Sequence, residues 1–198
     1  GILTSSGKEI HCNKVILTTG TFLNGMIHIG DKRTPAGRYN EKPTIGLSEQ
    51  LLKYKFKIGR LKTGTPPRLD GKTINYSNLE EQHPDDQASF FSFLTKKNIN
   101  KQISCGITYT NEKVHELISK NIEQSAMYSG SIKGVGPRYC PSIEDKIHKF
   151  KDKTRHQIFL EPEGLEDSTV YPNGISTSLP ADLQQEICNN INGLENVK

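Results

Sequence analysis

Residues 134–150 read Gly134-Val-Gly-Pro-Arg-Tyr-Cys-Pro-Ser-Ile-Glu-Asp-Lys-Ile-His-Lys-Phe150, and the interpretation of the whole chain starts from them. The first half is rich in Gly and Pro, which predicts a turn rather than a helix or a strand. Ser142 followed by Asp145 is typical of a helix N-terminus, and Ile143 and Ile147 recur at helical spacing. The sequence therefore predicts a helix that begins after Ser142.

Cys140 lies two residues before this predicted N-cap. Unpaired backbone N–H groups at a helix start favour negative charge, and Arg138 and Lys146 add positive charge nearby. Such a setting favours the thiolate, the nucleophilic form of a cysteine. Two other interpretations remain open: Cys140 is a buried, inert residue, or the helix start receives a phosphate or pyrophosphate.

The composition indicates a globular chain without an obligatory nucleic-acid partner. The 198 residues are enough for one sizeable or two small domains, and 33% of them are hydrophobic. Mean hydropathy is −0.61 and the pI is about 8.8. The net charge of +4 permits an anionic partner such as a nucleotide or RNA. No apolar run approaches the roughly 20 residues needed to span a bilayer, so no membrane association is expected.

The four cysteines are scattered, at Cys12, Cys105, Cys140 and Cys188. Without a CxxC pair or a regular spacing they predict free thiols in a reducing compartment rather than a disulfide framework or a zinc site. The chain begins without Met, in what is expected to be a β-hairpin, so it is interpreted as an internal segment of a longer protein.

The amino-terminal residues predict short strands with a ligand-accessible end. Strands are expected on both sides of the turn at residues 5–8, and again at Val15–Thr19. The small residues Thr19 and Gly20 after that strand would let a nucleotide approach the backbone, although an ordinary turn explains them equally well. Thr44 is expected to cap a helix that runs to about Tyr54, where its hydroxyl could also hold a flavin or phosphate oxygen.

The rest of the chain is expected to contain a second set of strands and helices. Gly64-Thr-Pro-Pro-Arg68 predicts a domain boundary. Strands are expected at residues 56–61, 90–93, 103–109 and 156–160, and helices after Thr110 or Asn111 and after Pro180. Glu161 and Glu163 could act as an acid–base pair, but two exposed carboxylates in a turn are the simpler interpretation.

Several long motifs resemble one family. They are Thr18-Thr-Gly-Thr-Phe-Leu-Asn-Gly25, Gly59-Arg-Leu-Lys-Thr-Gly-Thr-Pro-Pro-Arg68, Met127-Tyr-Ser-Gly130, residues 134–146, His156-Gln-Ile-Phe-Leu-Glu-Pro-Glu-Gly-Leu165 and Tyr171-Pro-Asn-Gly-Ile-Ser-Thr-Ser-Leu-Pro180. On these the chain is similar, over essentially its whole length, to the MnmG (GidA) family of flavoenzymes, which carry out carboxymethylaminomethyl modification of the tRNA wobble uridine.

The resemblance implies an α/β fold: part of a Rossmann-like FAD-binding domain with an inserted α/β domain that binds NADH. Residues 1–65 and 164–198 would belong to the FAD-binding domain, and residues 66–163 to the insertion. The family's FAD-domain fingerprint, its second essential cysteine and its carboxyl-terminal helical domain have no counterpart in these residues. A segment with half an FAD site is expected to be inactive alone.

The resemblance also implies a set of functional residues. Cys140 matches a cysteine regarded as essential, and Thr19, Gly20 and Thr44 fall in the FAD-binding part. The NADH-binding segment matches Gly136, Pro137, Arg138, Tyr139, Cys140, Pro141, Ser142, Ile143, Glu144, Asp145, Lys146, Ile147, His148, Lys149 and Phe150.

The family uses FAD, NADH, methylenetetrahydrofolate and glycine or ammonium. It acts on tRNA together with the GTPase MnmE, as a homodimer within a heterotetramer, in the cytoplasm or in mitochondria of eukaryotes. Cys140 would add to C6 of uracil or assist the one-carbon transfer, and the sequence leaves both roles open.

Two rival interpretations belong to other classes. One is the folate-dependent tRNA uridine methyltransferase group, which resembles this family in its FAD domain but lacks the long insertion and the Arg138–Lys146 run. The other is a non-catalytic module that binds RNA or a partner. It is disfavoured because the basic residues show no interleaved aromatic platform.

Overall fold

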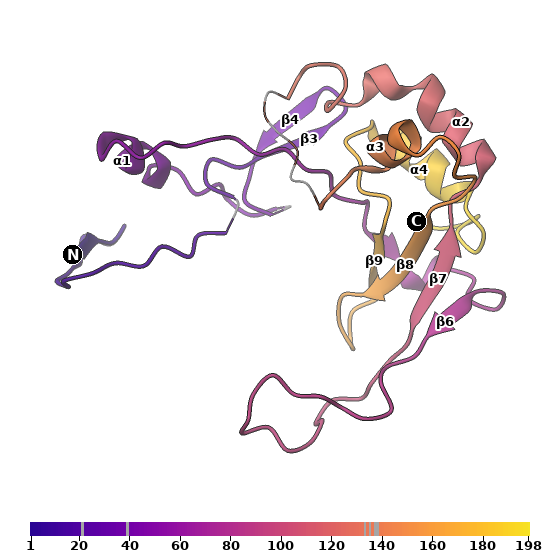
Figure 1. Cartoon of the computed structure of the whole chain (residues 1–198), viewed down its shortest axis with the longest axis horizontal. Coiled ribbons are helices and arrows are strands. Elements are labelled where there is room, and N and C mark those ends of the chain that lie inside the picture. The colour runs from indigo at the N-terminus through magenta and orange to yellow at the C-terminus, as the bar shows by residue number, and fades with distance from the viewer. Residues whose placement is uncertain (21, 39, 133, 135, 137–138) are drawn as a thin grey trace. The chain divides into compact units, whose positions relative to one another are not determined.

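The computed structural model (Figure 1) describes residues 1–20, 22–38, 40–132, 134, 136 and 139–198. The chain divides into two compact units. Unit 1 comprises Gly1–Ile27 and Arg33–Ile58, and unit 2 comprises His28–Lys32 and Gly59–Lys198. The described part of the chain contains no helix long and apolar enough to cross a membrane.

Unit 1 begins with the predicted hairpin. Strands β1 (Ile2–Leu3) and β2 (Glu9–Ile10) pair antiparallel. The turn between them is closed by the Thr4 amide, which donates to the Lys8 carbonyl at 3.0 Å. Gly7 has a φ of +81°, a conformation that glycine adopts without steric cost. Strands β3 (Met26–Ile29) and β4 (Lys32–Pro35) form a second two-stranded sheet, which spans the division between the units.

The helix of unit 1 starts later than predicted. Helix α1 runs over Leu47–Lys53 with Gly46 as its N-cap at a φ of +98°, so the prediction that Thr44 caps it is wrong. Thr44 instead forms a parallel bridge with Leu23, and its carbonyl accepts a hydrogen bond from the Asn24 amide at 2.9 Å. This bridge holds Thr44 in an extended conformation, which prevents it from starting the helix.

The strands predicted at residues 15–19 and 56–61 do not form among the described residues. Residues 15–19 and 56–60 form neither strand nor helix, and only Leu61 makes an isolated bridge. Ile16 is 87% exposed, as expected for an apolar run without a sheet around it. A β-branched run becomes a strand only where neighbouring strands accept its backbone hydrogen bonds, and no strand of the described residues pairs with this one.

Unit 2 is built on a five-stranded sheet in the order β5-β9-β8-β7-β6. Its strands are β5 (Leu69–Asp70), β6 (Glu80–Gln82), β7 (Cys105–Tyr109), β8 (Gln157–Pro162) and β9 (Thr169–Asn173). All neighbouring pairs are antiparallel. The prediction of strands at 103–109 and 156–160 is confirmed, and β8 extends two residues further because Glu161 and Pro162 pair with β9.

One face of this sheet is buried and the other is partly open. The buried positions alternate along β7, β8 and β9 and face one another in register: Gly106, Thr108, Ile158, Leu160, Val170 and Pro172. This alternation is what a sheet with one packed face requires. The intervening residues, such as Phe159 and Tyr171, are only half-buried.

Three helices, α2, α3 and α4 (Figure 1), contribute side chains to one hydrophobic core. Helix α2 (Glu112–Lys120) begins where predicted: Asn111 Oδ1 accepts a hydrogen bond from the Val114 amide at 2.9 Å. Helix α3 (Ile143–Lys149) starts after Ser142, as its sequence predicts, and α4 (Ala181–Asn189) follows Pro180. Short 3-10 helices cover Gly71–Thr73 and Ile122–Gln124. The core side chains include Val114, Ile118, Ile143, Leu183 and Ile187.

The strand predicted at Phe90–Phe93 is wrong. Residues 83–104 contain only turns and bends and connect β6 to β7 as one long loop. The mixed α/β class is confirmed. Residue 164 is where the FAD-binding domain is predicted to resume. The hydrophobic core contains residues from both sides of this position, since Ile158 and Ile187 belong to one cluster.

Candidate active site

Cys140 is exposed and lies two residues before the N-cap of α3. Its Sγ is 2.9 Å from Thr63 Oγ1, within hydrogen-bonding distance, and either atom could donate. Thr63 belongs to the irregular segment after Gly59, far away in sequence. The thiol is therefore held by a hydroxyl on one side and remains accessible, unlike the buried Cys188, whose pKa burial raises to about 12.

The start of α3 is satisfied by its own residues. Ser142 Oγ accepts from the Asp145 amide at 3.1 Å, and Asp145 Oδ2 accepts from the Ser142 amide at 3.4 Å, which completes a capping box. With only seven residues and two carboxylates in its first turn, α3 has little capacity left to attract a further anion. Other groups must supply any positive charge beside Cys140.

Lys146 supplies such a charge from the second turn of α3. Its ammonium donates to the Gly174 carbonyl at 2.8 Å and keeps two further N–H donors. Burial lowers the pKa of Lys146, and the electrostatic interaction with Cys140 opposes this shift. Lys146 is therefore a cation of α3 that interacts electrostatically with Cys140.

A buried carboxylate ties α3 to two other segments. Glu144 is fully buried, and its Oε1 accepts hydrogen bonds from Ser125 Oγ at 2.9 Å and Thr177 Oγ1 at 2.8 Å. Ser178 Oγ lies 2.9 Å from Ser125 Oγ and accepts from the Met127 amide. Glu144 Oε2 is buried without a hydrogen-bond partner among the described residues. These contacts fix the position of α3, and therefore of the segment that carries Cys140.

An open pocket of about 390 Å³ lies beside α3. The residues lining it are Pro141, Lys146, Phe150, His156, Gln157, Phe159, Asn173 and Gly174. It combines the side chains of Phe150, Phe159, Lys146 and His156. The Nε2 atom of His156 is buried and has no hydrogen-bond partner among the described residues. Apolar walls with a few convergent polar groups are characteristic of ligand pockets.

His156 forms a pair with His115 on α2. Their ring centroids are 5.3 Å apart, and Thr110 Oγ1 joins them by bonding His115 Nε2 and the His156 amide, both at 2.8 Å. Burial lowers the pKa of both imidazoles. The neighbouring charges of His115, Lys146 and Lys153 lower that of His156 further, whereas Glu112 partly offsets the shift at His115.

We expect this pair to make the protein less stable in mild acid. The unfolded chain binds protons at its histidines near the ordinary pKa of 6.5, whereas the folded chain binds them only at lower pH. The free energy of unfolding should therefore fall as the pH drops from 7 to 5. Thermal unfolding across this range should show a shallower fall for His156→Gln and an unchanged one for the exposed control His11→Gln. Equal slopes in all three proteins would contradict the assignment.

The family is shown by sequence. A model of the family described as glucose inhibited division protein A matches residues 1–198, which is the whole chain. The chain belongs to the GidA family.

Curated relatives in the GidA family carry the name tRNA uridine 5-carboxymethylaminomethyl modification enzyme MnmG. The chain is 58% identical over 198 residues to that of Thermodesulfovibrio yellowstonii and 53% identical to that of Geobacter sulfurreducens. All of this chain but only 32% of each relative is covered. The chain therefore spans about a third of the length of the curated relatives it matches.

Solved GidA structures agree with the fold. The structure of Aquifex aeolicus GidA in the form I crystal matches with a TM-score of 0.80 at 55% identity, covering 91% of this chain and 31% of that one. The form II crystal structure gives a TM-score of 0.77 at 50% identity, with 91% and 29% coverage. The chain is thus similar in fold to one part of GidA.

The predicted site residues of this GidA segment fall in both units. Thr19, Gly20 and Thr44 lie in unit 1, and the Gly136–Phe150 set lies in unit 2. Pro137 and Arg138 lie outside the described residues. Within unit 2, Lys146 interacts electrostatically with Cys140. Ser142, Ile143 and Glu144 are buried, whereas Tyr139, His148, Lys149 and Phe150 are exposed.

Several residues of the site were not predicted from the sequence. They come from segments distant in sequence: Thr63, Ser125, Thr177 and His156. The sequence around each of them does not predict a contact with α3 or its pocket. The carboxylates of Glu161 and Glu163 each have a partner other than the other carboxylate, which does not favour an acid–base pair. Glu161 accepts from Asn173, and Glu163 pairs with Arg68.

Proposed function

We propose that this chain is part of an enzyme that adds a carboxymethylaminomethyl group to C5 of the tRNA wobble uridine. One observation carries the proposal: an exposed Cys140 thiol in contact with Thr63, beside a lysine and an open pocket, in a chain whose relatives bear that name. FAD, NADH and methylenetetrahydrofolate are the cofactors we propose, with glycine as the amine donor. The proposed setting is the cytoplasm, with MnmE as partner.

The chemistry requires a nucleophile at C6. Carbon C5 of uracil becomes nucleophilic when a thiolate forms a bond to C6 and moves an electron pair towards C5. After C5 has bonded to the one-carbon unit, it loses its proton, and the C6–S bond breaks to release the thiolate. Cys140 suits this role because a soft, accessible sulfur adds to C6 and leaves again readily.

Thr63 and Lys146 would assist this sulfur. The Thr63 hydroxyl can donate to the thiolate at the observed 2.9 Å, and the Lys146 ammonium adds positive potential. Glu144 acts beneath them by holding α3 in place. Thr63 and Lys146 would together stabilise the Cys140 thiolate before it attacks C6 of uracil and after the C6–S bond breaks.

We propose that the pocket beside α3 binds one half of a nicotinamide dinucleotide. Its volume of about 390 Å³ is at the small end of ligand pockets, which suits a single nucleotide. Phe150 and Phe159 would pack against a ring, and Lys146 would meet a phosphate. NADH, when bound, supplies the hydride that reduces the flavin. The pocket lies in the stretch proposed as the inserted domain, residues 66–163, together with Asn173 and Gly174.

The residues proposed for FAD fit a close approach of the cofactor to the backbone. Gly20 has a φ of +61°, and an added Cβ would meet no atom within 4 Å, so its backbone is open on that side. Thr44 is exposed and could offer its hydroxyl. From the resemblance to the family, we propose that residues 1–65 and 164–198 belong to the FAD-binding domain.

The Lys146→Glu change in the full-length protein tests the pocket. A reversed charge should repel the dinucleotide phosphates and raise the KM for NADH about tenfold or more, because a charge-assisted contact is worth roughly 1.5–3 kcal/mol. Bound flavin, measured by its absorbance, should stay at the wild-type level. The control Lys113→Glu changes the same charge on exposed α2.

If Lys146→Glu had the wild-type KM for NADH, Lys146 would not take part in binding the dinucleotide. Modified nucleosides analysed by mass spectrometry provide the test of the reaction itself. The proposal requires 5-carboxymethylaminomethyluridine at the wobble position. Detection of 5-methyluridine as the product would contradict it.

A further inference from the structure

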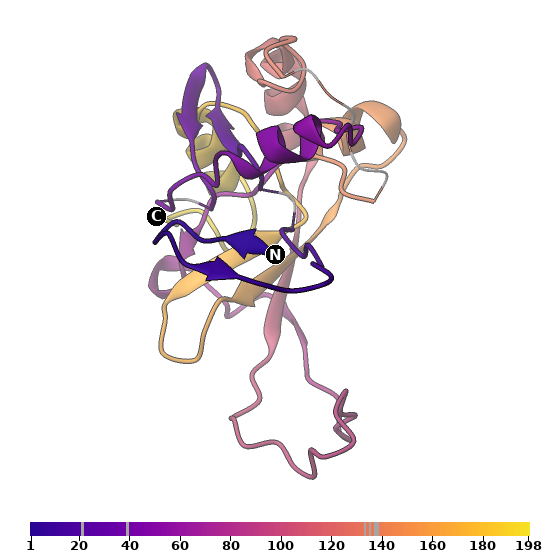
Figure 2. The same cartoon turned by 90° about the vertical axis from the view of Figure 1, so that its left-hand side faces the viewer.

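The loop between β6 and β7 is unusually long for a connection between paired strands. Gln82 and Cys105 face each other in the sheet, and His83 Nδ1 bonds Ser104 Oγ at 2.8 Å, so the loop from 83 to 104 is closed at its base. It contains no helix or strand and extends away from α2 and α3 in both views (Figures 1 and 2). Structureless loops beyond about 12–15 residues are uncommon unless they serve a function.

The loop exposes large apolar side chains that no core requires. Phe91 is fully exposed, Phe93 is 97% exposed and Leu94 is 88% exposed. A turn at Ser92 presents them: its carbonyl accepts from the Thr95 amide at 3.2 Å, and its hydroxyl accepts from the Leu94 amide. Neighbouring exposed apolar side chains of this size mark an interaction site.

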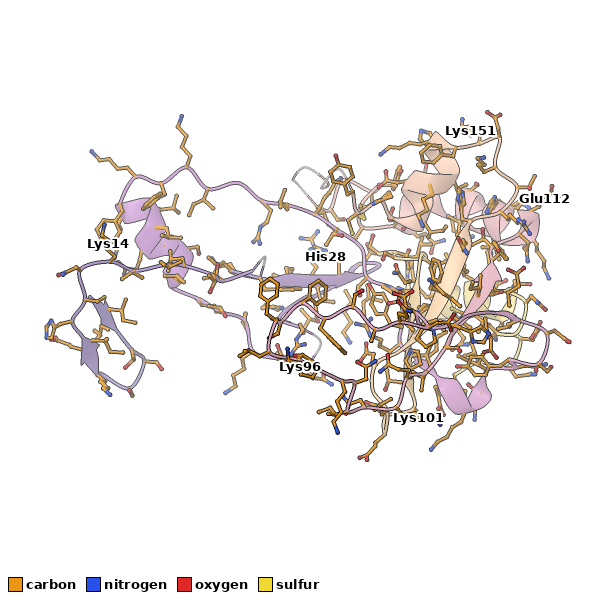
Figure 3. All side chains as sticks on the ribbon, turned by 60° about the horizontal axis from the view of Figure 1, so that its bottom comes forward. Lys14, His28, Lys96, Lys101, Glu112 and Lys151 are labelled. Carbon is orange, nitrogen blue, oxygen red and sulfur yellow. The ribbon has the colours of Figure 1, made fainter. Side chains whose placement is uncertain are left out.

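Positive charge follows directly after these rings. Lys96, Lys97 and Lys101 are exposed, and residues 87–104 contain no carboxylate, although Asp85 and Asp86 precede them. Lys96 Nζ lies 3.4 Å from the Phe93 carbonyl, which places an ammonium group beside the aromatic turn. Figure 3 shows Lys96 and Lys101 at separate points of the loop.

We propose that this loop binds unpaired nucleotides of an RNA, with bases stacked on Phe91 and Phe93 and phosphates held by Lys96 and Lys97. Aromatic side chains next to lysines are the means by which proteins hold single strands. A protein-docking loop is less well matched, since protein interfaces are depleted in lysine. The sequence did not predict this platform because the rings precede the lysines along the chain and do not alternate with them.

The identity of the RNA as tRNA rests on the proposed function, whereas binding of a single strand does not. The direct test measures binding of fluorescein-labelled oligouridylate to the full-length protein over a range of salt concentrations. The variants are Phe91→Ser/Phe93→Ser and Lys96→Gln/Lys97→Gln. The control Lys72→Gln/Lys113→Gln removes the same charge from exposed positions outside the loop.

The two loop variants should fail in different ways. Loss of stacking should raise the Kd for oligouridylate about tenfold or more in the phenylalanine variant, with the salt slope unchanged. Loss of two phosphate contacts should weaken binding in the lysine variant and reduce the slope of log K against log salt by about 1.4. The control should bind like wild type, and all variants should keep the wild-type melting temperature.

Wild-type RNA affinity in both loop variants would overturn the proposal, as would equal losses in the control. If they keep RNA affinity but elute at a changed mass in size-exclusion chromatography, the loop instead docks a protein chain. Failure of the proposed function would give a different result from failure of the loop proposal. The wild-type protein would then leave the wobble uridine unmodified, while its binding of oligouridylate would still depend on the loop.

Discussion

Replacing Cys140 by Ser is expected to reduce formation of the modified wobble uridine by about 100-fold or more, because a serine hydroxyl is a far weaker nucleophile than a thiolate at neutral pH. Serine can still accept or donate the hydrogen bond to Thr63, so the local structure should persist. Flavin content and the melting temperature should stay at wild-type values. The measurement is mass spectrometry of nucleosides from tRNA incubated with the full-length protein.

Cys12→Ser is the matched control for this change. Cys12 is also exposed and free, but it lies in the hairpin region of unit 1 rather than beside α3. Its replacement should leave the modification rate unchanged. If Cys140→Ser modified tRNA as fast as Cys12→Ser, Cys140 would have no part in the chemistry.

Glu144→Ala is expected to cost about 3 kcal/mol of stability, because it leaves buried hydroxyl donors unpaired and opens a cavity. Ser125 and Thr177 both lose the acceptor Glu144 Oε1, which is fully buried. The melting temperature should fall by roughly 6–12 °C if the affected unit is of ordinary size. Hydrogen exchange should increase in residues 142–149 and 175–179.

Glu144→Gln separates the hydrogen bonds from the carboxylate itself. Its Oε1 can still accept from Ser125 and Thr177, and its amide replaces an Oε2 that has no partner among the described residues. We expect this variant to melt within about 4 °C of wild type, since it loses less than about 1 kcal/mol. Wild-type melting of Glu144→Ala would show that the buried network does not hold α3.

Local signals predicted the helices well. Ser142 with Asp145, and Asn111 before α2, specify helix starts through hydrogen bonds that lie within three residues. The apolar spacing of Val114, Ile118 and Ile143 then identified the faces that enter the core. Such patterns are readable because the sequence itself contains both partners of each interaction.

Strands depended on partners that local patterns do not reveal. Residues 15–19 and 90–93 both have strand-forming side chains, yet neither meets a neighbouring strand in the described residues. Thr44 failed as a cap for a similar reason, because its bridge to Leu23 is a contact between separate segments. Ile103–Tyr109 succeeded because β6 and β8 lie on both sides of β7.

The residues of the candidate site also differ in whether local sequence could predict them. Cys140 and Lys146 could be proposed from one continuous stretch of sequence, and both lie at the start of α3 as expected. Thr63, Ser125, Thr177 and His156 could not, because each reaches α3 or its pocket from a distant segment. The sequence thus identified the cysteine that we propose as nucleophile, whereas the side chains around it became visible only in the fold.

Peptide mapping by mass spectrometry can ask directly whether the Cys140 sulfur bonds to C6 of the wobble base. The full-length protein is incubated with its cofactors and a tRNA that carries 5-fluorouridine at that position, where fluorine prevents the loss of a proton from C5 and so preserves the C6–S bond. We predict an RNA-linked peptide that contains Cys140. A link at another cysteine, or none under conditions in which ordinary tRNA is modified, would contradict the assignment.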